Sequence, residues 1–167
     1  LTATTLAAFV ESRRREGAAL EAMLLARIDA MDVIVKRITP LIPQVIAQFQ
    51  QKAIERMQDA LGLAGHGTPS TLTRQEAFER IRQEVTLYGI RIDVSEELSR
   101  LTAHLTETRH ILKKGGQVGK RLDFMMQELN REANTLGAKA SVKELADASM
   151  ELKLLIEQMR EQVQNLE

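Results

Sequence analysis

The chain has 167 residues, and its 23 basic and 23 acidic side chains give a formal net charge of zero. The length suits one domain, or one and a half, and the balanced charge means that any binding to nucleic acid must come from local patches. The absence of cysteine excludes disulfides and thiolate zinc sites, and no run of about 18 apolar residues is present to form a membrane span.

The composition predicts an all-α fold. Leu, Ala, Glu, Arg, Gln and Met dominate, and these residues are strong helix formers. The chain has only three prolines, one tyrosine and four phenylalanines. Stacking platforms for single-stranded bases are therefore expected to be scarce.

The first 62 residues are predicted to form a hairpin of two helices. Apolar residues recur every three or four positions over residues 5–39, Pro40 and Pro43 interrupt the pattern, and a second helix follows over residues 44–61. A short turn between two long helices favours an antiparallel pair. The apolar positions of the first helix are Leu20, Leu24, Ile28, Met31, Val35 and Ile38.

Residues 63–72 are predicted to be a flexible loop, because glycine, proline and serine gather there. Thr73 and Glu76 have the spacing of a capping box and start the helical C-terminal domain, residues 73–167. The stretch around Gly89 is open to two interpretations, a short break or a continued helix.

The C-terminal domain is predicted to contain further long helices. Capping-box spacing recurs at Asp93 with Glu96 and at Ser141 with Glu144, the sequence KKGG at residues 113–116 is typical of a helix end, and Gly137 is expected to end the next helix. The last helix has a sevenfold apolar repeat, and no segment alternates like a strand. We therefore expect all-α architecture with long antiparallel hairpins, coiled-coil-like packing and assembly into an oligomer. The repeat consists of Leu145, Leu152, Met159 and Leu166.

Charge is separated along this neutral chain. Six basic residues and one acid give residues 100–121 a local charge of +5, whereas two basic residues and six acids give residues 144–167 a charge of −4. The basic segment could clamp a phosphate backbone. Alternatively, its cations complement helix ends and pair with the acidic helix.

Four side chains could carry the chemistry of a metal site. Glu128 and Glu132 are four residues apart and share a helix face, and so do Glu97 and His104, which are seven apart. Together they could hold Mg²⁺ or Mn²⁺ through oxygen ligands, with His104 as a ligand or proton shuttle. The alternative is that the carboxylates pair with arginines on a wet surface.

Three stretches resemble the C-terminal region of the YicC/YloC family. They are RIDVSEELSRL at 91–101, ILKKGGQVGKRLDFMMQELNREANTLGAKAS at 111–141 and ELKLLIEQMREQVQNLE at 151–167. SRRREGAAL at 12–20 is similar to the middle region of the family, whereas TLYGIRID at 86–93 departs from its usual pattern. The motif residues are Asp93, Glu96, Glu97, Lys113, Lys114, Gly119, Arg121, Asp123, Gln127, Glu128, Asn130, Arg131, Glu132 and Asn134.

The resemblance implies a bacterial, cytoplasmic endoribonuclease, linked to the stress response and dependent on a divalent metal ion. It also implies a ring-like homo-oligomer, a hexamer, that encloses RNA, and an N-terminal domain beyond the chain given. No catalytic set is carried over from the family, but the resemblance favours the candidates found from spacing and chemistry. Glu128, Glu132 and His104 are the predicted catalytic residues, and Glu97, Glu128 and Glu132 are the predicted metal ligands. The predicted RNA-binding residues are Lys113, Lys114, Lys120, Arg121, Gln127, Asn130, Arg131 and Asn134.

Two other functions remain open. The chain could bind RNA without cutting it and present it to another nuclease, in which case binding should weaken steeply with salt. It could also be an assembly module alone, with the early hairpin and the last helix as interfaces.

Overall fold

The computed structural model describes residues 2–64 and 74–165, and over these residues it contains helices and no strand. The predicted all-α class is confirmed. The six helices are α1 (Thr2–Ile38), α2 (Leu41–Ala64), α3 (Arg74–Ile92), α4 (Ser95–Lys114), α5 (Gly119–Lys139) and α6 (Lys143–Gln164).

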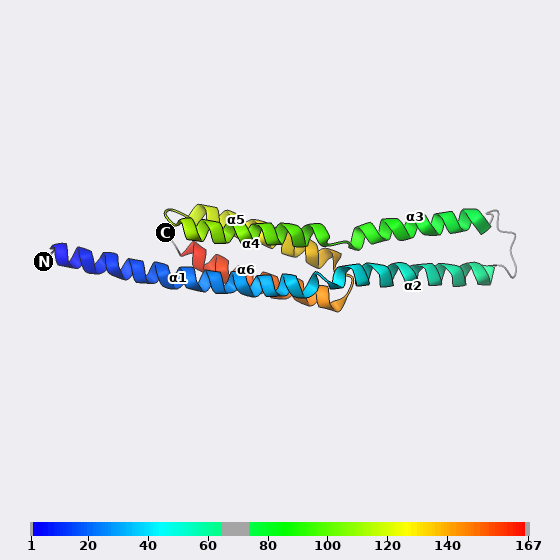
Figure 1. The fold of residues 1–167 in the computed structure, drawn as a ribbon, viewed down its shortest axis with the longest axis horizontal. Coiled ribbons are helices and arrows are strands. Elements are labelled where there is room, and N and C mark those ends of the chain that lie inside the picture. Colours follow the sequence, from blue (N-terminus) through cyan, green and yellow to red (C-terminus); the bar gives the residue numbers. More distant parts are fainter. Residues whose placement is uncertain (1, 65–73, 166–167) are drawn as a thin grey trace.

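Four of these helices form an antiparallel bundle. The C-terminal half of α1 packs against α4 and α6, and α5 packs against α4 and α6 on the other side (Figure 1). The apolar positions predicted from the helical period line its core, because residues three and four apart share a face. Leu24, Ile28 and Met31 of α1 are fully buried there. Leu101, Leu105, Leu122, Leu129, Leu136, Leu145, Leu152 and Met159 join them.

The other two helices, α2 and α3, form an arm that extends from one end of the bundle (Figure 1). The arm is an insertion between the first and second helices of the bundle, α1 and α4. Its buried residues are few, with Ile81 and Val85 of α3 facing α2. The antiparallel partner of α2 is therefore α3.

The predicted hairpin over residues 1–62 is wrong, because α1 and α2 lie almost end to end (Figure 1). The backbone N–H and the hydroxyl of Thr39 both donate to the carbonyl of Val35, and the N–H of Ile42 donates to Thr39. The helical path is therefore interrupted at Pro40 for one turn only. Pro43 lies in the first turn of α2, where its missing N–H costs no helical hydrogen bond.

The boundaries of α2 and α3 also differ from the prediction. α2 continues to Ala64, so the predicted loop of residues 63–72 begins as helix, and its remaining residues lie outside those described. Thr73 of the first capping box lies outside them too. α3 continues through Gly89 to Ile92, which decides the open alternative in favour of helix.

Two glycine predictions have different outcomes. The helix end predicted at KKGG is confirmed, since α4 ends at Lys114 and Gly115 follows with φ 66°. Gly137 does not end α5, which continues to Lys139. A Cβ on Gly137 would lie 2.5 Å from Oγ of Ser149, so this glycine permits close approach of α5 and α6.

The two remaining capping boxes are incomplete. Asp93 accepts hydrogen bonds from the N–H and hydroxyl of Ser95, but Glu96 pairs with Arg100 and does not complete the box. Val142 precedes α6, and the hydroxyl of Ser141 is buried without a hydrogen-bond partner. The third box is therefore wrong, because Ser141 lies one residue too early.

The first half of α1 extends beyond the bundle. Residues 2–19 are exposed on every side, including Leu6, Phe9 and Val10. In the described part of the chain, no helix is both long and apolar enough to cross a membrane.

Candidate functional site

Three ion pairs and one histidine–carboxylate contact join α4 to α5 across one side of the bundle, and we call this set the α4–α5 ladder. The two helices run antiparallel. Residues three or four apart on α4 therefore share one face, and each successive residue on that face contacts a residue with a lower number on α5. The predicted carboxylates and histidine all lie in this ladder. The pairs are Glu97 with Lys139 (2.7 Å), Arg100 with Glu132 (3.6 Å), His104 with Glu128 (4.0 Å) and Glu107 with Arg121 (3.3 Å).

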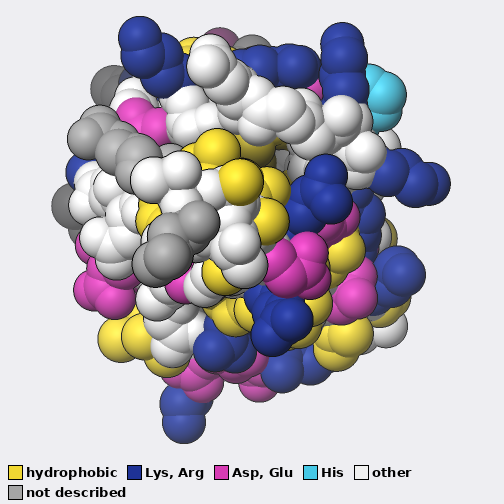
Figure 2. Space-filling model, turned by 90° about the vertical axis from the view of Figure 1, so that its left-hand side faces the viewer, with side chains coloured by type: hydrophobic (Ala, Val, Ile, Leu, Met, Phe, Trp, Pro, Cys, Tyr) yellow, Lys and Arg dark blue, Asp and Glu magenta, His cyan; other side chains and the backbone are white. Residues whose placement is uncertain are grey.

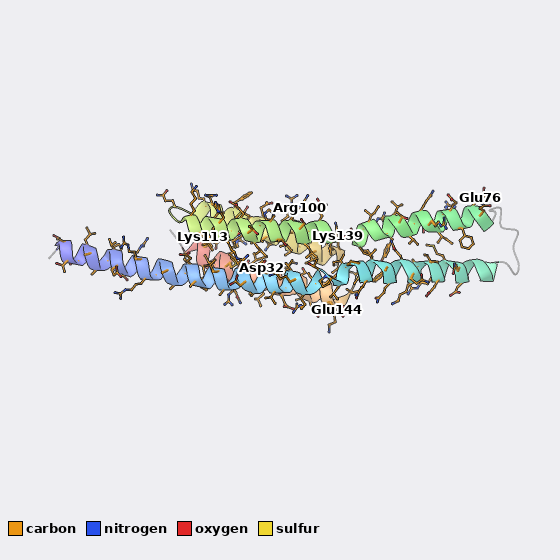
Figure 3. All side chains as sticks on the ribbon, viewed as in Figure 1. Asp32, Glu76, Arg100, Lys113, Lys139 and Glu144 are labelled. Atoms are coloured by element: carbon orange, nitrogen blue, oxygen red, sulfur yellow. The ribbon has the colours of Figure 1, made fainter. Side chains whose placement is uncertain are left out.

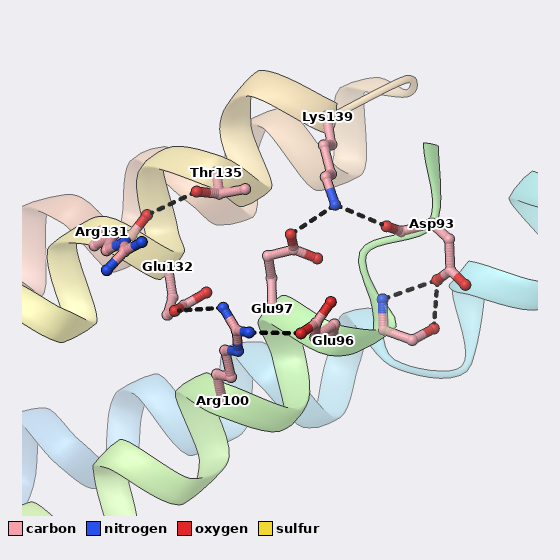
Figure 4. Close-up of polar contacts among 9 residues, drawn as sticks. Asp93, Glu96, Glu97, Arg100, Arg131, Glu132, Thr135 and Lys139 are labelled. Atoms are coloured by element: carbon pink, nitrogen blue, oxygen red, sulfur yellow. Dashed lines mark hydrogen bonds and ion pairs between the residues drawn. The ribbon is translucent and has the colours of Figure 1, made fainter. Parts of the chain in front are cut away.

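Two carboxylates of the ladder are buried and held by cations. Glu97 is 6% exposed and Glu132 is 4% exposed. Nζ of Lys139 lies between Glu97 and the backbone carbonyl of Asp93, and the guanidinium of Arg100 lies between Glu132 and the exposed Glu96 (Figure 4). A buried carboxylate that loses such a partner is strongly destabilising, so both cations are important where α4 meets α5.

The predicted metal-ligand set is not assembled. Glu128 and Lys139, the partner of Glu97, are eleven residues apart on α5, which corresponds to about 16 Å along the helix. Glu132 faces Arg100, whose positive charge opposes a cation at the same carboxylate. No group of three His, Asp or Glu side chains able to hold a metal ion occurs among the described residues.

His104 and Glu128 form the most accessible pair of candidate catalytic groups in the ladder. Nε2 of His104 lies 4.0 Å from the nearer oxygen of Glu128, and each side chain is about one-quarter exposed, at 24% and 26%. An imidazole beside a carboxylate can be oriented for proton transfer while remaining open to a substrate. The structure therefore brings together two of the three predicted catalytic residues in one accessible place.

Four predicted RNA-binding residues line a shallow hollow between α5 and α6, which we call the amide hollow. Its volume is about 450 Å³, and Arg160 of α6 contributes to its wall. Two amides are linked, with Asn134 donating to Asn130 over 2.6 Å, while the guanidinium of Arg131 points outward without an ion-pair partner in the described chain. The predicted residues in the hollow are Gln127, Asn130, Arg131 and Asn134.

Three lysines near the turn between α4 and α5 are exposed and have no ion-pair partner within residues 2–64 and 74–165. We call Lys113, Lys114 and Lys120 the lysine turn. It lies at the end of the bundle where the N-terminus projects (Figures 1 and 3). Figure 2 looks onto that end, and Lys and Arg side chains stand around its rim.

The other basic residues of this segment are paired. Arg109 bonds to Asp29 over 2.6 Å and to Asp32, both on α1. The hydrogen bond that Arg109 donates to Asp29 is the largest of the effects that raise the pKa of Arg109 above its ordinary value, so this side chain stays charged. Arg121 pairs with Glu107. The acids that pair with this segment thus lie on α1, α4 and α5, and among the described residues none lies on α6, the expected acidic partner.

Sequence reasoning missed three features of this surface. Arg160 joins the amide hollow only because α6 packs beside α5. Phe124 is 58% exposed, and it shares the outward face of α5 with Gln127 and Arg131. Lys139 was missed as the partner of Glu97, because the two residues are 42 positions apart in sequence.

Comparisons with known proteins agree with the resemblance found in the sequence. The family described as "Endoribonuclease YicC-like, C-terminal" matches residues 38–167. The chain is similar to a "Probable endoribonuclease YicC" of Haemophilus influenzae, with 44% identity over 95% of the chain and 51% of that protein. It is also similar to a protein of that name in Clostridioides difficile, with 29% identity over 94% of the chain and 50% of that protein. The chain thus spans about half the length of these curated relatives.

Proposed function

Because the chain belongs to the family of YicC-like endoribonucleases, we propose that it takes part in cleaving phosphodiester bonds of RNA. One observation supports this most directly, the accessible His104–Glu128 pair, whose Glu128 lies on α5 within the span of residues 126–135 that line the amide hollow. The lysines offer phosphate contacts, and the amides and Arg131 offer hydrogen-bond donors for phosphate and sugar oxygens.

In this proposal His104 transfers a proton and Glu128 orients its ring. The attacking oxygen forms a bond to phosphorus as the bond from phosphorus to the leaving oxygen breaks. In-line displacement places these two oxygens on opposite sides of phosphorus. The His104–Glu128 pair lies in one place, so it can take part in only one of the two proton transfers. The protonated imidazole would give its proton to the leaving oxygen, and water would accept the proton of the nucleophile.

Glu132 is proposed as a positioning residue, since its carboxylate is buried and paired with Arg100. Dependence on Mg²⁺ or Mn²⁺ stays a prediction. Of the three predicted ligands, Glu128 is the most accessible, and a bound ion would need ligands beyond Glu97 and Glu132. Cleavage measured with EDTA, and again after Mg²⁺ or Mn²⁺ is restored, tests this.

The experiment is cleavage of an end-labelled hairpin RNA by this chain and by a protein of the relatives' length. We expect His104→Gln and Glu128→Gln to lower the cleavage rate at least about 100-fold, the scale of one lost proton transfer. Glu96→Gln, an exposed carboxylate on α4, is the matched control and should cut normally. Undiminished cutting by both variants would remove His104 and Glu128 from the chemistry.

A second candidate function is RNA binding without cleavage. It is favoured by the unpaired charges of the lysine turn, which need no catalytic group beside them. A pure sample that binds RNA but never cuts it, in any metal, would establish this function. Replacing the three lysines with alanine should reduce the salt dependence of single-strand binding by about two in logarithmic slope.

Assembly into a ring-like hexamer is also proposed. The exposed apolar side chains of the first half of α1, among them Leu6 and Phe9, support an interface there, since such residues usually pack against a partner. Light scattering should show six copies. A monomer at every concentration would contradict the ring.

A further inference from the structure

A hollow lies in the arm, far from the α4–α5 ladder. It is about 600 Å³ in volume and opens between α2 and α3, and we call it the arm pocket. This volume is within the range of small-ligand sites, about 300–1,000 Å³. Its walls are Phe49, Lys52, Ala53, Arg56 and Met57 of α2 and Glu84, Val85, Leu87, Tyr88 and Arg91 of α3.

Two aromatic rings stand together in this pocket. The ring centroids of Phe49 and Tyr88 are 6.1 Å apart, and the planes are tilted by 41°. Tyr88 is 42% exposed, so much of its ring remains open to a ligand. In a chain with five Phe and Tyr residues in all, a pair at one pocket is a local concentration of stacking surface.

The pocket is also positively charged. Lys52, Arg56 and Arg91 lie on its walls with one acid, Glu84, which leaves a local charge of +2. None of the three cations has an ion-pair partner in residues 2–64 or 74–165. The cations of the α4–α5 ladder, by contrast, are all held by carboxylates. The charges of the arm are therefore available to an anionic ligand.

We propose that the arm pocket binds a segment of single-stranded RNA. One unstacked base lies against Tyr88 beside Phe49, and the neighbouring phosphates contact Lys52, Arg56 and Arg91. Single strands fit this chemistry because their bases are free to stack on an aromatic ring while the backbone follows a basic groove. A duplex keeps its bases stacked on each other and would bind by charge alone.

This inference rests on the proposed RNA-related function and adds a second contact, remote from His104 and Glu128. The arm extends from the end of the bundle opposite the lysine turn (Figures 1 and 3). An RNA strand held at both places would lie along the outside of the bundle. The arm then supplies affinity and orientation, and the bundle supplies the reacting groups.

The test is equilibrium binding of a fluorescein-labelled single-stranded RNA to the whole chain, measured by anisotropy. We expect Tyr88→Ala to weaken binding about ten-fold, the loss of one stacked base, and Tyr88→Phe to bind like the parent protein. Phe78→Ala removes an exposed ring of the same helix outside the pocket and is the matched control. Circular dichroism verifies that each variant keeps its helices.

The cations are tested separately. Lys52→Ala with Arg56→Ala should lower the logarithmic salt slope of binding by about 1.4, because two phosphate contacts are lost. Arg82→Ala, an exposed arginine of α3 that does not line the pocket, should lower it by less.

The outcomes separate this inference from the proposed function. If the parent protein binds no RNA, both fail. If the parent binds RNA and Tyr88→Ala binds equally well, the arm pocket inference alone fails. A change of mass in light scattering for Tyr88→Ala, with unchanged RNA affinity, would also overturn it and identify the pocket as a contact between protein chains.

Discussion

The bundle and the arm are built from the same kind of amphipathic helix, yet they differ in how far their charged side chains are paired and their apolar side chains are buried. In the bundle, a continuous core is fully buried and a row of cations and carboxylates pairs between α4 and α5. In the arm, few residues are buried, aromatic rings are partly exposed, and the cations around the pocket lack acidic partners within the described chain.

This difference separates charges that are paired within the protein from charges that are available to a ligand. Ion pairs within a protein neutralise charges that could otherwise contact a polyanion, so the charges of the ladder are already used in contacts between α4 and α5. Unpaired cations beside aromatic rings retain their attraction for phosphate. Motif residues of the bundle thus divide into paired ones, such as Glu97 and Arg121, and open ones, such as Arg131.

The largest expected effect is on the core of the bundle. Leu129→Ala should lower the free energy of unfolding by about 4 kcal/mol, because this fully buried side chain would leave a cavity. Ile81→Ala, in the arm, should speed hydrogen exchange within α2 and α3 and leave the main urea transition of the bundle nearly unchanged. Equal shifts of that transition by both variants would show that bundle and arm unfold as one unit.

The next largest effect concerns the buried pair of the ladder. Lys139→Met should destabilise the bundle by about 3 kcal/mol, because it leaves the buried carboxylate of Glu97 without its cation. Arg37→Met breaks the exposed pair with Glu151 and should cost less than about 1 kcal/mol. Urea unfolding at pH 7 measures both. Combining Glu97→Gln with Lys139→Met should recover part of the loss, and no recovery would assign it to packing of the lysine stem.

The sequence predicted the helices and their buried faces better than their partners. The core stripe of α1, including Ile28 and Met31, follows from local periodicity, and the structure confirms it. Whether a chain folds back at a proline depends instead on distant partners. Here the apolar face of α1 is buried against α4 and α6, and no local signal at Pro40 reports this.

In the candidate site, too, the shared helix faces could be predicted from the sequence, whereas the contacts between helices could not. That Glu128 and Glu132 share a face could be predicted from their spacing of four, and the structure confirms that both contact α4. That His104 and Arg100 are their partners depends on the register between α4 and α5, which core packing decides. The arm pocket was missed because its walls come from two helices separated by residues 65–73, and neither helix carries a motif alone.

A smaller effect is expected when a glycine at a helix contact is replaced, compared with a glycine that has no neighbouring atoms. Gly137→Ala should destabilise the bundle by about 2 kcal/mol, because the new Cβ would meet Oγ of Ser149 where α5 and α6 approach. Gly17→Ala lies on the exposed half of α1 with no atom near its new Cβ, so it should increase helicity and stability slightly. Thermal unfolding followed by circular dichroism tests both. Adding Ser149→Ala should relieve part of the strain at Gly137, although it also removes a hydrogen bond to Ala133.

The smallest effect lies at the junction of arm and bundle, where Asp93 precedes α4. The hydroxyl of Ser95, its backbone N–H and the nearby Lys139 lower the pKa of Asp93 below its ordinary value, against the opposing effect of burial. A lowered pKa in the folded state stabilises the fold above the ordinary value of about 3.9, and this contribution is lost as the pH falls through the folded pKa.

Ser95→Ala should therefore raise the pKa of Asp93 toward its ordinary value and cost less than about 1 kcal/mol at pH 7. The difference from the parent protein should disappear in acid, where Asp93 is protonated in both. Ser99→Ala, an exposed serine one turn along α4, is the control. Carboxyl NMR titration measures the pKa directly. If Ser95→Ala and Ser99→Ala give the same titration curve for Asp93, the hydroxyl of Ser95 does not stabilise this carboxylate, and the start of α4 relies on packing where arm and bundle meet.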